Sequence, residues 1–165
     1  MTGVQTCALP ISATFDLVPR TLDDQRSWLA ARSGAFSAVV AIGPPSTNSA
    51  DAVDAVLGFA SLSPYKERAA YRTSVEDSVY VRRDAHGGGV GKLLLNHILD
   101  VAAASGFHAV MARIEASSSA SKGLHVACGF ELVGIEREIG RKFGRWLDVA
   151  LMQCVLHERA TGSRR

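Results

Sequence analysis

A run of glycines stands out at positions 86–92, which read HGGGVGK. It follows a strand-like segment and leads into a helix-like one, so its backbone N–H groups would lie at the positive end of a helix dipole and favour an anion such as phosphate. A P-loop needs glycine and Ser or Thr where this chain has His86 and Leu93. The dinucleotide motif GxGxxG needs glycine in place of Lys92, and the esterase HGGG loop needs a GxSxG motif that the sequence lacks. The loop therefore predicts an anion site of another kind.

Two titratable side chains are candidates for proton transfer. Glu76 lies in the strand-like segment before the glycine loop, and His125 lies in the second helix-like segment after it. A carboxylate can act as a general base, and an imidazole can give or take a proton near pH 7. From the residues alone, Glu76 is more simply interpreted as a solvent-facing strand residue, and His125 could equally be packed on a helix face. We expect His97 and His108 to be structural or surface residues.

The pattern of apolar residues predicts the elements that position these groups. A capping threonine followed by two acids predicts a helix over 21–32. Two β-rich runs predict a hairpin with a long polar loop. The predicted segments are strands at 36–42, 56–62, 74–81, 107–114, 130–138 and 146–156, helices at 90–105 and 119–128, and loops at 43–54, 82–91 and 140–145. This order predicts an α/β (α+β) fold with a mixed sheet, including at least one parallel pair and a final hairpin.

Length and composition limit the class of protein. The chain has 165 residues, of which 47% are hydrophobic and 21% charged, and its formal net charge is +2. One domain is expected at this length, and the scattered charges form no basic stripe for nucleic acid. The longest apolar runs are too short for a membrane-spanning helix. Cys7, Cys128 and Cys154 show no metal-ligand spacing, so we expect no metal site and a reducing, cytoplasmic compartment.

Four blocks of sequence, taken in order, resemble one family. They are Ser12–Phe15 (SATF), Tyr65–Val81 (YKERAAYRTSVEDSVYV), Leu124–Phe130 (LHVACGF) and Lys142–Val149 (KFGRWLDV). Together with the glycine loop, they resemble the phosphinothricin N-acetyltransferase branch of the GNAT superfamily of N-acetyltransferases, over residues 12–156. The resemblance implies the GNAT fold, in which helices flank a mixed, mostly antiparallel central sheet.

The resemblance implies acetyl-CoA as co-substrate, with its pyrophosphate on the glycine loop. Main-chain N–H groups of Val79, Tyr80 and Val81 would hold the pantetheine arm and polarise the thioester carbonyl. The other residues implied to bind acetyl-CoA are His86, Gly87, Gly88, Gly89, Val90, Gly91, Lys92, Ser118 and Ser121. Two of them depart from the family pattern, because His86 replaces the usual Gln or Arg and Ser118 replaces a frequent Asn.

The resemblance also implies roles for the titratable residues. Glu76 matches the family's proposed catalytic base, and His125 stands where many related enzymes have a tyrosine that protonates the leaving thiolate. The sequence does not divide the acid and base roles between them. Lys66, Arg68 and Tyr71 precede the Glu76 strand and suit a substrate carboxylate or phosphinate, although a solvated loop explains them equally well.

These observations predict an acetyl-CoA-dependent N-acetyltransferase acting on the amine of a small amino-acid-like acceptor, of the phosphinothricin, methionine sulfone or methionine sulfoximine type. One alternative is a GNAT enzyme acting on a polyamine or a protein N-terminus. The other is a non-catalytic acyl-CoA-binding module or an inactive fragment. We expect a homodimer, and Lys142, Arg145 and Trp146 could approach either the acceptor site or the partner.

The first residues are expected to form a separate segment. Residues 1–11 (MTGVQTCALPI) have neither hydrophobic period nor capping signal and resemble a translated sequencing adapter. We therefore expect this non-native segment, a single N-acetyltransferase domain over 12–156 and a polar tail over 157–165. Because the family begins with a strand and a helix ahead of the SATF block, we expect those two elements to be missing.

Overall fold

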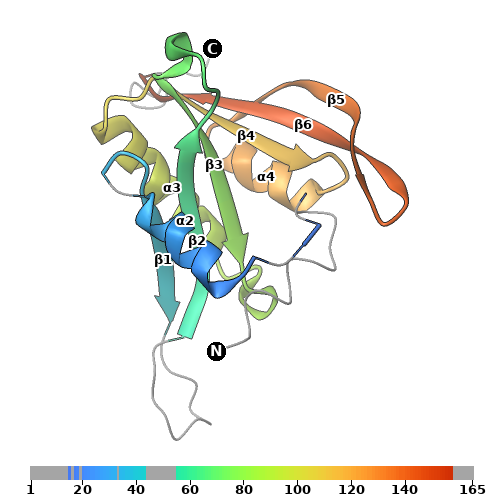
Figure 1. Ribbon diagram of the computed structural model, residues 1–165, viewed down its shortest axis with the longest axis horizontal. Coiled ribbons are helices and arrows are strands. Elements are labelled where there is room, and N and C mark those ends of the chain that lie inside the picture. Colours follow the sequence, from blue (N-terminus) through green and yellow to red (C-terminus); the bar gives the residue numbers. More distant parts are fainter. Residues whose placement is uncertain (1–14, 16, 19, 33, 44–54, 158–165) are drawn as a thin grey trace, which may run out of the picture.

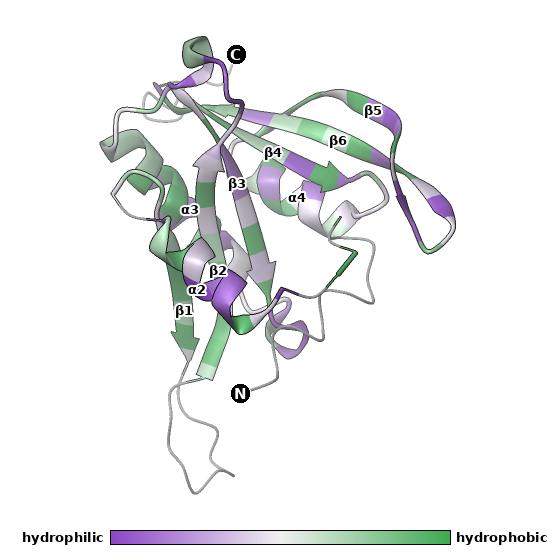
Figure 2. Cartoon of the chain, viewed as in Figure 1, coloured by the Kyte–Doolittle hydropathy of each residue, from purple (hydrophilic) through white to green (hydrophobic). Residues whose placement is uncertain are grey.

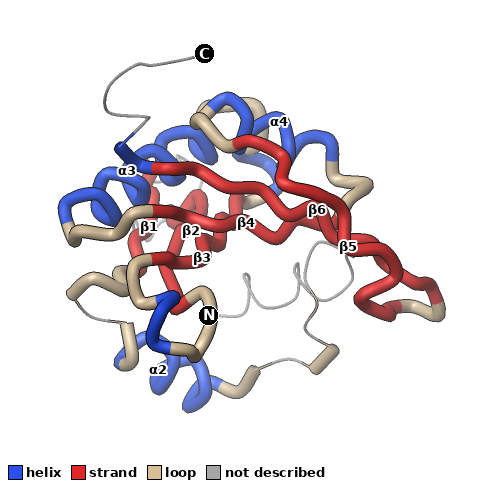
Figure 3. The backbone as a smooth tube through the Cα atoms, turned by 90° about the horizontal axis from the view of Figure 1, so that it is seen from above, coloured by secondary structure: helices blue, strands red, loops and turns tan. Residues whose placement is uncertain are grey.

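The computed structural model describes residues 15, 17–18, 20–32, 34–43 and 55–157, which form one six-stranded sheet with helices on both faces (Figures 1 and 3). The strands are β1 (Ala38–Gly43), β2 (Ala55–Pro64), β3 (Ser74–Val81), β4 (Ala109–Glu115), β5 (Glu131–Lys142) and β6 (Arg145–Val155). The α-helices are α2 (Leu22–Ala30), α3 (Val90–Ala104) and α4 (Ser119–Ala127), and short 3-10 helices are η1 (Ala69–Tyr71) and η2 (Arg83–Ala85). The predicted α/β class is confirmed.

The strand order in the sheet is β1-β2-β3-β4-β6-β5. Within the described residues, β3 and β4 run parallel and every other neighbouring pair is antiparallel. A parallel pair needs a crossover connection, and α3 provides it between β3 and β4. The predicted mixed, mostly antiparallel sheet is therefore confirmed.

The hydrophobic core lies between the sheet and helices α3 and α4, which cover the same face (Figure 3). Helix α3 is mainly hydrophobic along its visible length (Figure 2), and it buries Leu94, Leu95, Ile98, Leu99 and Ala102. These side chains belong to the same core cluster as Ala60, Leu62, Val75, Val110 and Ala112 of the central strands. Since each buried aliphatic side chain contributes about 1.5–3 kcal/mol, this packing fixes the strands that carry the site.

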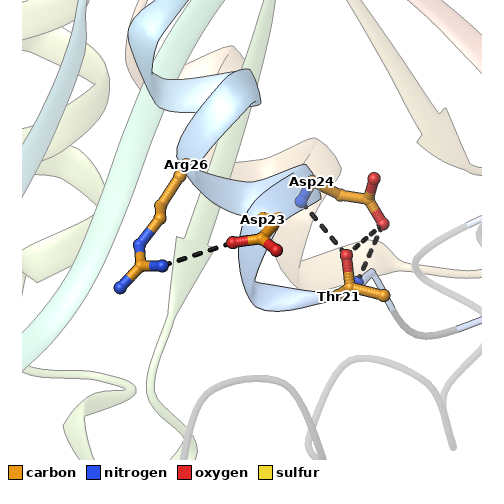
Figure 4. A network of polar contacts seen from close by, with 4 residues as sticks. All are labelled: Thr21, Asp23, Asp24 and Arg26. Atoms are coloured by element: carbon orange, nitrogen blue, oxygen red, sulfur yellow. Dashed lines mark hydrogen bonds and ion pairs between the residues drawn. The ribbon is translucent and has the colours of Figure 1, made fainter.

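Helix α2 lies on the opposite face of the sheet from α3 (Figure 3). It begins with a capping box, in which the Asp24 N–H donates to the Thr21 hydroxyl at 3.1 Å and the Thr21 N–H donates to the Asp24 carboxylate at 3.0 Å (Figure 4). Trp28 then packs edge-on against Phe59 of β2, with ring centroids 6.3 Å apart. This contact holds α2 against the sheet.

The last hairpin is longer than the sequence predicted. A turn was expected over 140–145, but β5 continues to Lys142 and pairs there with Arg145. The turn consists of Phe143 and Gly144, whose φ angles are 51° and 73°. Two positive φ angles are the type I′ pattern, which matches the twist of paired strands. Strands β5 and β6 therefore form a long arm that extends beyond the rest of the sheet (Figure 1).

Strand β4 begins at Ala109, two residues later than predicted. The Phe107 N–H donates to the carbonyl of Ala102 at 3.1 Å, and Gly106 has a φ of 81°. This is the hydrogen-bond pattern of a helix C-terminus. Phe107 therefore completes the end of α3 instead of starting the strand.

Several expectations fall outside the described residues. They concern the segment 1–11, the SATF block except Phe15, most of the loop at 43–54 and the tail beyond His157. Among the residues that the structure describes, no helix is long and apolar enough to cross a membrane. The same residues contain no cluster of three or more His, Cys, Asp or Glu side chains that could hold a metal ion.

Candidate active site

The parallel strands β3 and β4 separate just beyond Glu76. Strand β3 is paired with β2 as far as Val81, but with β4 only from Ser74 to Glu76. The two strands form a V in Figure 1. Beyond Glu76, the edge of β3 that faces β4 therefore lacks a partner strand within the described residues, so a ligand can reach this edge.

The predicted thioester-binding residues lie on this free edge. Val79 and Val81 pack against the hydrophobic core. Tyr80, on the opposite face, stacks on Phe59 with ring centroids 4.9 Å apart. Because all three side chains are used in packing, β3 presents its backbone to the opening of the V. The main-chain role expected for these residues is compatible with this geometry and stays a prediction.

The glycine loop follows β3 and leads into α3. Gly87 and Gly89 have φ angles of 78° and 80°, which glycine adopts without strain. The first helical hydrogen bond runs from the Leu93 N–H to the carbonyl of Gly89, at 3.0 Å. In the described part of the chain, the N–H groups from Gly87 to Lys92 have no acceptor. Free N–H groups at the start of a 15-residue helix are suited to bind an anion.

His86 links the glycine loop to the end of β3. Its Nε2–H donates to the carbonyl oxygen of Val81 at 3.1 Å, so the residue that replaces the usual Gln or Arg helps to set the loop's shape. Gly91 lies where α3 approaches α4, since a Cβ atom there would come within 3.0 Å of a methyl carbon of Leu124. The close approach explains why glycine suits this position.

The two serines of the predicted acetyl-CoA site lie at the start of α4. Ser118 is the N-cap residue of α4, and its side chain forms no capping hydrogen bond. The Ser121 side chain is half-buried, while its carbonyl oxygen receives a hydrogen bond from His125. Their predicted contacts with acetyl-CoA stay predictions.

Glu76 lies half-buried on the sheet face opposite α3 and α4. Burial raises the pKa of its carboxyl group above the usual value. The nearby Arg113 guanidinium opposes this rise, while the carboxylates of Asp77 and Glu136 add to it. A raised pKa makes the carboxylate a better match for taking a proton from an ammonium group.

His125 is buried and hydrogen-bonded at both ring nitrogens. Nδ1 lies 2.7 Å from the Ser121 carbonyl oxygen, and Nε2 lies 3.2 Å from Oδ2 of Asp77. Since a carbonyl oxygen only accepts, Nδ1 must carry a hydrogen, and a further proton must then lie between Nε2 and the carboxylate. Burial alone would lower the pKa of His125, but the hydrogen bond and charge of Asp77, helped by the Ser121 carbonyl, raise it above its usual value.

Asp77 is a site residue that the sequence analysis missed. Its side chain is 1% exposed, and its Oδ1 atom is buried with no hydrogen-bond partner among the described residues. A buried carboxylate is costly unless it is paired, so the contact with His125 is what keeps it inside. A signal existed in the strand pattern, because Asp77 has the same parity as the inward-facing Val75 and Val79.

The two predicted proton-transfer residues lie on opposite faces of β3. Successive strand residues point to opposite faces, and Asp77 meets His125 on the α4 side. Glu76 therefore points to the other side, and the structure does not bring Glu76 and His125 together. Glu76 is half-exposed, whereas the His125 side chain is only 5% exposed.

The predicted acceptor-binding residues lie together in the loop between β2 and β3. Lys66, Glu67, Arg68 and Tyr71 line an open hollow there. The Lys66 ammonium lies 4.8 Å and 5.1 Å from the ring centroids of Tyr65 and Tyr71, so both aromatic faces help to position it. The pairing of Ser63 with Glu76 places this loop just beyond the Glu76 end of the paired strands.

Comparison with known proteins identifies the family. A model of the acetyltransferase (GNAT) domain matches residues 49–151. The chain is a GNAT acetyltransferase. It is 43% identical over 142 residues to the L-methionine sulfoximine/L-methionine sulfone acetyltransferase of Pseudomonas paraeruginosa, covering 86% of this chain and 78% of that one. It is 42% identical over 139 residues to the phosphinothricin N-acetyltransferase of Streptomyces coelicolor, covering 83% and 77%.

A solved structure supports the same assignment. The crystal structure of a GNAT superfamily phosphinothricin acetyltransferase from Sinorhizobium meliloti, in complex with AcCoA, has a TM-score of 0.82 and 35% identity. The match covers 97% of this chain and 82% of that one. This confirms the GNAT fold, and acetyl-CoA is the acetyl donor of this acetyltransferase. The free N–H groups of the glycine loop and the open edge of β3 fit the phosphate and amide groups of that co-substrate.

Proposed function

We propose that this GNAT acetyltransferase acetylates the α-amine of a small amino acid of the phosphinothricin, methionine sulfone or methionine sulfoximine type. The substrates named for the two relatives support this acceptor class. The observation that carries the proposal is the position of Glu76. This half-buried carboxylate lies on the last rung before β3 and β4 separate, next to the loop between β2 and β3 whose residues Lys66, Glu67, Arg68 and Tyr71 line the basic hollow.

The proposed chemistry assigns one task to each group. Acetyl-CoA, when bound, supplies the acetyl group as a thioester. Glu76 takes a proton from the acceptor ammonium, directly or through water, to give the neutral amine. Main-chain N–H groups over Val79–Val81 polarise the acetyl carbonyl. The neutral amine attacks the carbonyl carbon, so that the C–N bond forms and the C–S bond breaks. His125 gives its Nε2 proton to the departing sulfur, and the second proton on the nitrogen passes to solvent, which leaves the amide and CoA.

The basic hollow favours an acceptor that carries an acidic group. Arg68 can bind a carboxylate or phosphinate through two hydrogen bonds, and Lys66 adds a second positive charge whose position the tyrosines fix. The same charges repel a polyamine. We assign the acceptor's acid group to this hollow, so that its α-amine faces Glu76.

We also propose that the enzyme acts as a homodimer in the cytoplasm. The β5–β6 arm exposes Leu132, Val133, Ile139, Phe143 and Trp146 by more than half of their surface. A second copy of the chain would remove these apolar side chains from water. The buried thiols of Cys128 and Cys154 agree with a reducing compartment. Light scattering of Trp146→Ser against the wild type tests the dimer, and an unchanged mass would contradict the role of the arm.

The function is tested by release of free CoA from acetyl-CoA with phosphinothricin, methionine sulfone, methionine sulfoximine, spermidine or a short peptide. We expect release with at least one amino-acid analogue and only background hydrolysis with spermidine. Release with spermidine or the peptide alone would contradict the acceptor class. Binding of acetyl-CoA without release in any reaction would favour a non-catalytic module.

A matched pair of variants tests the role of Glu76. Glu76→Gln should lower kcat by about 10²–10⁴, the usual contribution of a general base, while the affinity for acetyl-CoA stays unchanged. The control is Glu131→Gln, which removes an exposed glutamate on β5 and should leave kcat unchanged. Equal kcat values for Glu76→Gln and the wild type would remove Glu76 from the base role.

A further inference from the structure

Arg113 and Glu136 form an ion pair outside the motifs by which the chain resembles its family. Nη2 of Arg113 lies 2.8 Å from Oε2 of Glu136, and the side chains are 39% and 38% exposed. Arg113 is on β4 and Glu136 is on β5, so the pair spans β6, which lies between them in the sheet. Exposed ion pairs contribute little to the free energy of unfolding. A gain in stability is therefore a weak explanation for the pairing of Arg113 with Glu136.

The pairing register places Arg113 across the V from Glu76. Glu76 pairs with Met111 on the last rung between β3 and β4. Arg113 follows Met111 by two residues on the same face, about 6–7 Å further along β4. Its charge also lowers the pKa of Glu76 against the effect of burial. Arg113 is therefore within electrostatic reach of the proposed base, on the face where the base is exposed.

The Arg113 guanidinium has donors left for a ligand. It carries five N–H groups, and the contact with Glu136 uses Nη2. The carboxylate of Glu136 thereby fixes one edge of the planar group and leaves the rest of it available on the exposed face. A guanidinium held in this way is suited to a second carboxylate or a phosphinate.

We infer that Arg113, oriented by Glu136, forms the second of two positively charged positions in the acceptor site and makes the enzyme prefer amino acids with an acidic side chain. The inference rests on the proposed function. The hollow at Lys66 and Arg68 provides one positive position and Arg113 the other, with Glu76 between them. Phosphinothricin carries two anionic groups, a carboxylate and a phosphinate, whereas methionine sulfone carries a carboxylate and a neutral sulfone.

The test compares kcat/KM for phosphinothricin and for methionine sulfone in the wild type, Arg113→Gln, Arg113→Lys and Arg26→Gln. The last is the control, since Arg26 forms an exposed ion pair with Asp23 on α2 (Figure 4). Arg113→Gln should lower the phosphinothricin/sulfone ratio about tenfold or more, as expected when a hydrogen bond between charged groups is lost. Arg113→Lys should restore part of the ratio, and Arg26→Gln should leave it unchanged.

The ratio of the two kcat/KM values separates acceptor preference from the protonation of Glu76. A change in the pKa of Glu76 would alter kcat/KM for both acceptors by the same factor, so it would cancel in the ratio. Thermal unfolding of Arg113→Gln near the wild-type temperature shows that the variant is folded. An unchanged ratio, with both rates measurable, would overturn this inference and leave the proposed function standing. Absence of turnover with every acceptor in the wild type would refute the proposed function, and this inference with it.

Discussion

Replacing Asp77 by asparagine should reverse the direction in which His125 makes the free energy of unfolding depend on pH. Asparagine keeps the shape of the side chain and removes its charge. Its amide N–H can donate to Nε2 of His125 while Nδ1–H stays bonded to Ser121. The wild-type pair shares a proton between imidazole and carboxylate, whereas the variant holds a neutral imidazole.

The direction of the effect follows from the two folded-state pKa values. In the wild type, the pKa of His125 is raised above its usual value of 6.5. Its stabilising contribution is therefore complete below about pH 6.5 and is lost as pH rises through the folded-state pKa. In the variant, burial becomes the main influence and lowers that pKa. The folded variant then loses stability as pH falls below about 6.5.

The magnitude follows from the kind of hydrogen bond that is lost. A buried hydrogen bond between charged groups contributes about 1.5–3 kcal/mol. We therefore expect the free energy of unfolding of Asp77→Asn to be lower than that of the wild type by about 2 kcal/mol near pH 6. The difference should shrink as pH rises through the raised pKa of His125 and should then change sign, because the wild type is left with a buried, unpaired carboxylate that the variant lacks.

Urea unfolding followed by tryptophan fluorescence, from about pH 6 to about pH 9, measures this difference. The control is Asp23→Asn, since Asp23 is an exposed aspartate that forms an ion pair with Arg26. Its effect should stay within about 0.5 kcal/mol at every pH. A difference for Asp77→Asn that is constant with pH, or that grows toward alkaline pH, would refute the shared proton.

Three further predictions concern the rate, the glycine loop and the core. The value of kcat/KM should fall as pH drops through the pKa of Glu76, which lies above its usual 4.5, and CoA release by Glu76→Gln should lack this fall. Gly89→Ala should weaken acetyl-CoA binding about tenfold in calorimetry, because φ at 80° strains any residue with a Cβ; equal affinity would contradict this role of the loop. Leu99→Ala, at a side chain with 0% exposure, should lower the free energy of unfolding by about 2–5 kcal/mol in urea, and a loss below about 1 kcal/mol would show that Leu99 is not a core residue.

Local patterns were sufficient to predict β3 and the start of α3. Strand 74–81 and the helix start at Val90 match the structure because the alternation of apolar residues and the glycine run both depend on neighbours in sequence. The prediction of the last hairpin turn was wrong, and the reason is also local. Gly140 suggested the turn, but Phe143 adopts positive φ without being glycine, which sequence patterns rarely indicate.

Contacts between distant segments explain what the sequence could not show. The separation of β3 from β4 beyond Glu76 depends on the register of a parallel pair formed across α3. The contact between Arg113 and Glu136 depends on β6 lying between β4 and β5. The partner of Asp77 is His125, which is 48 residues away. The strand alternation could have marked Asp77 as inward-facing, but it could not have named this partner.

The twofold period of β3 divides the site into two environments. Glu76 faces the half-exposed side, where Arg113 and the basic hollow provide positive charge for an acceptor. Asp77 faces the core, where its carboxylate and His125 hold a proton away from water. Substitutions on the Glu76 face should therefore change acceptor preference and rate with little effect on folding. Substitutions at the Asp77 face should change stability with pH as well as rate, because a buried charged pair cannot lose one member without a cost to the fold.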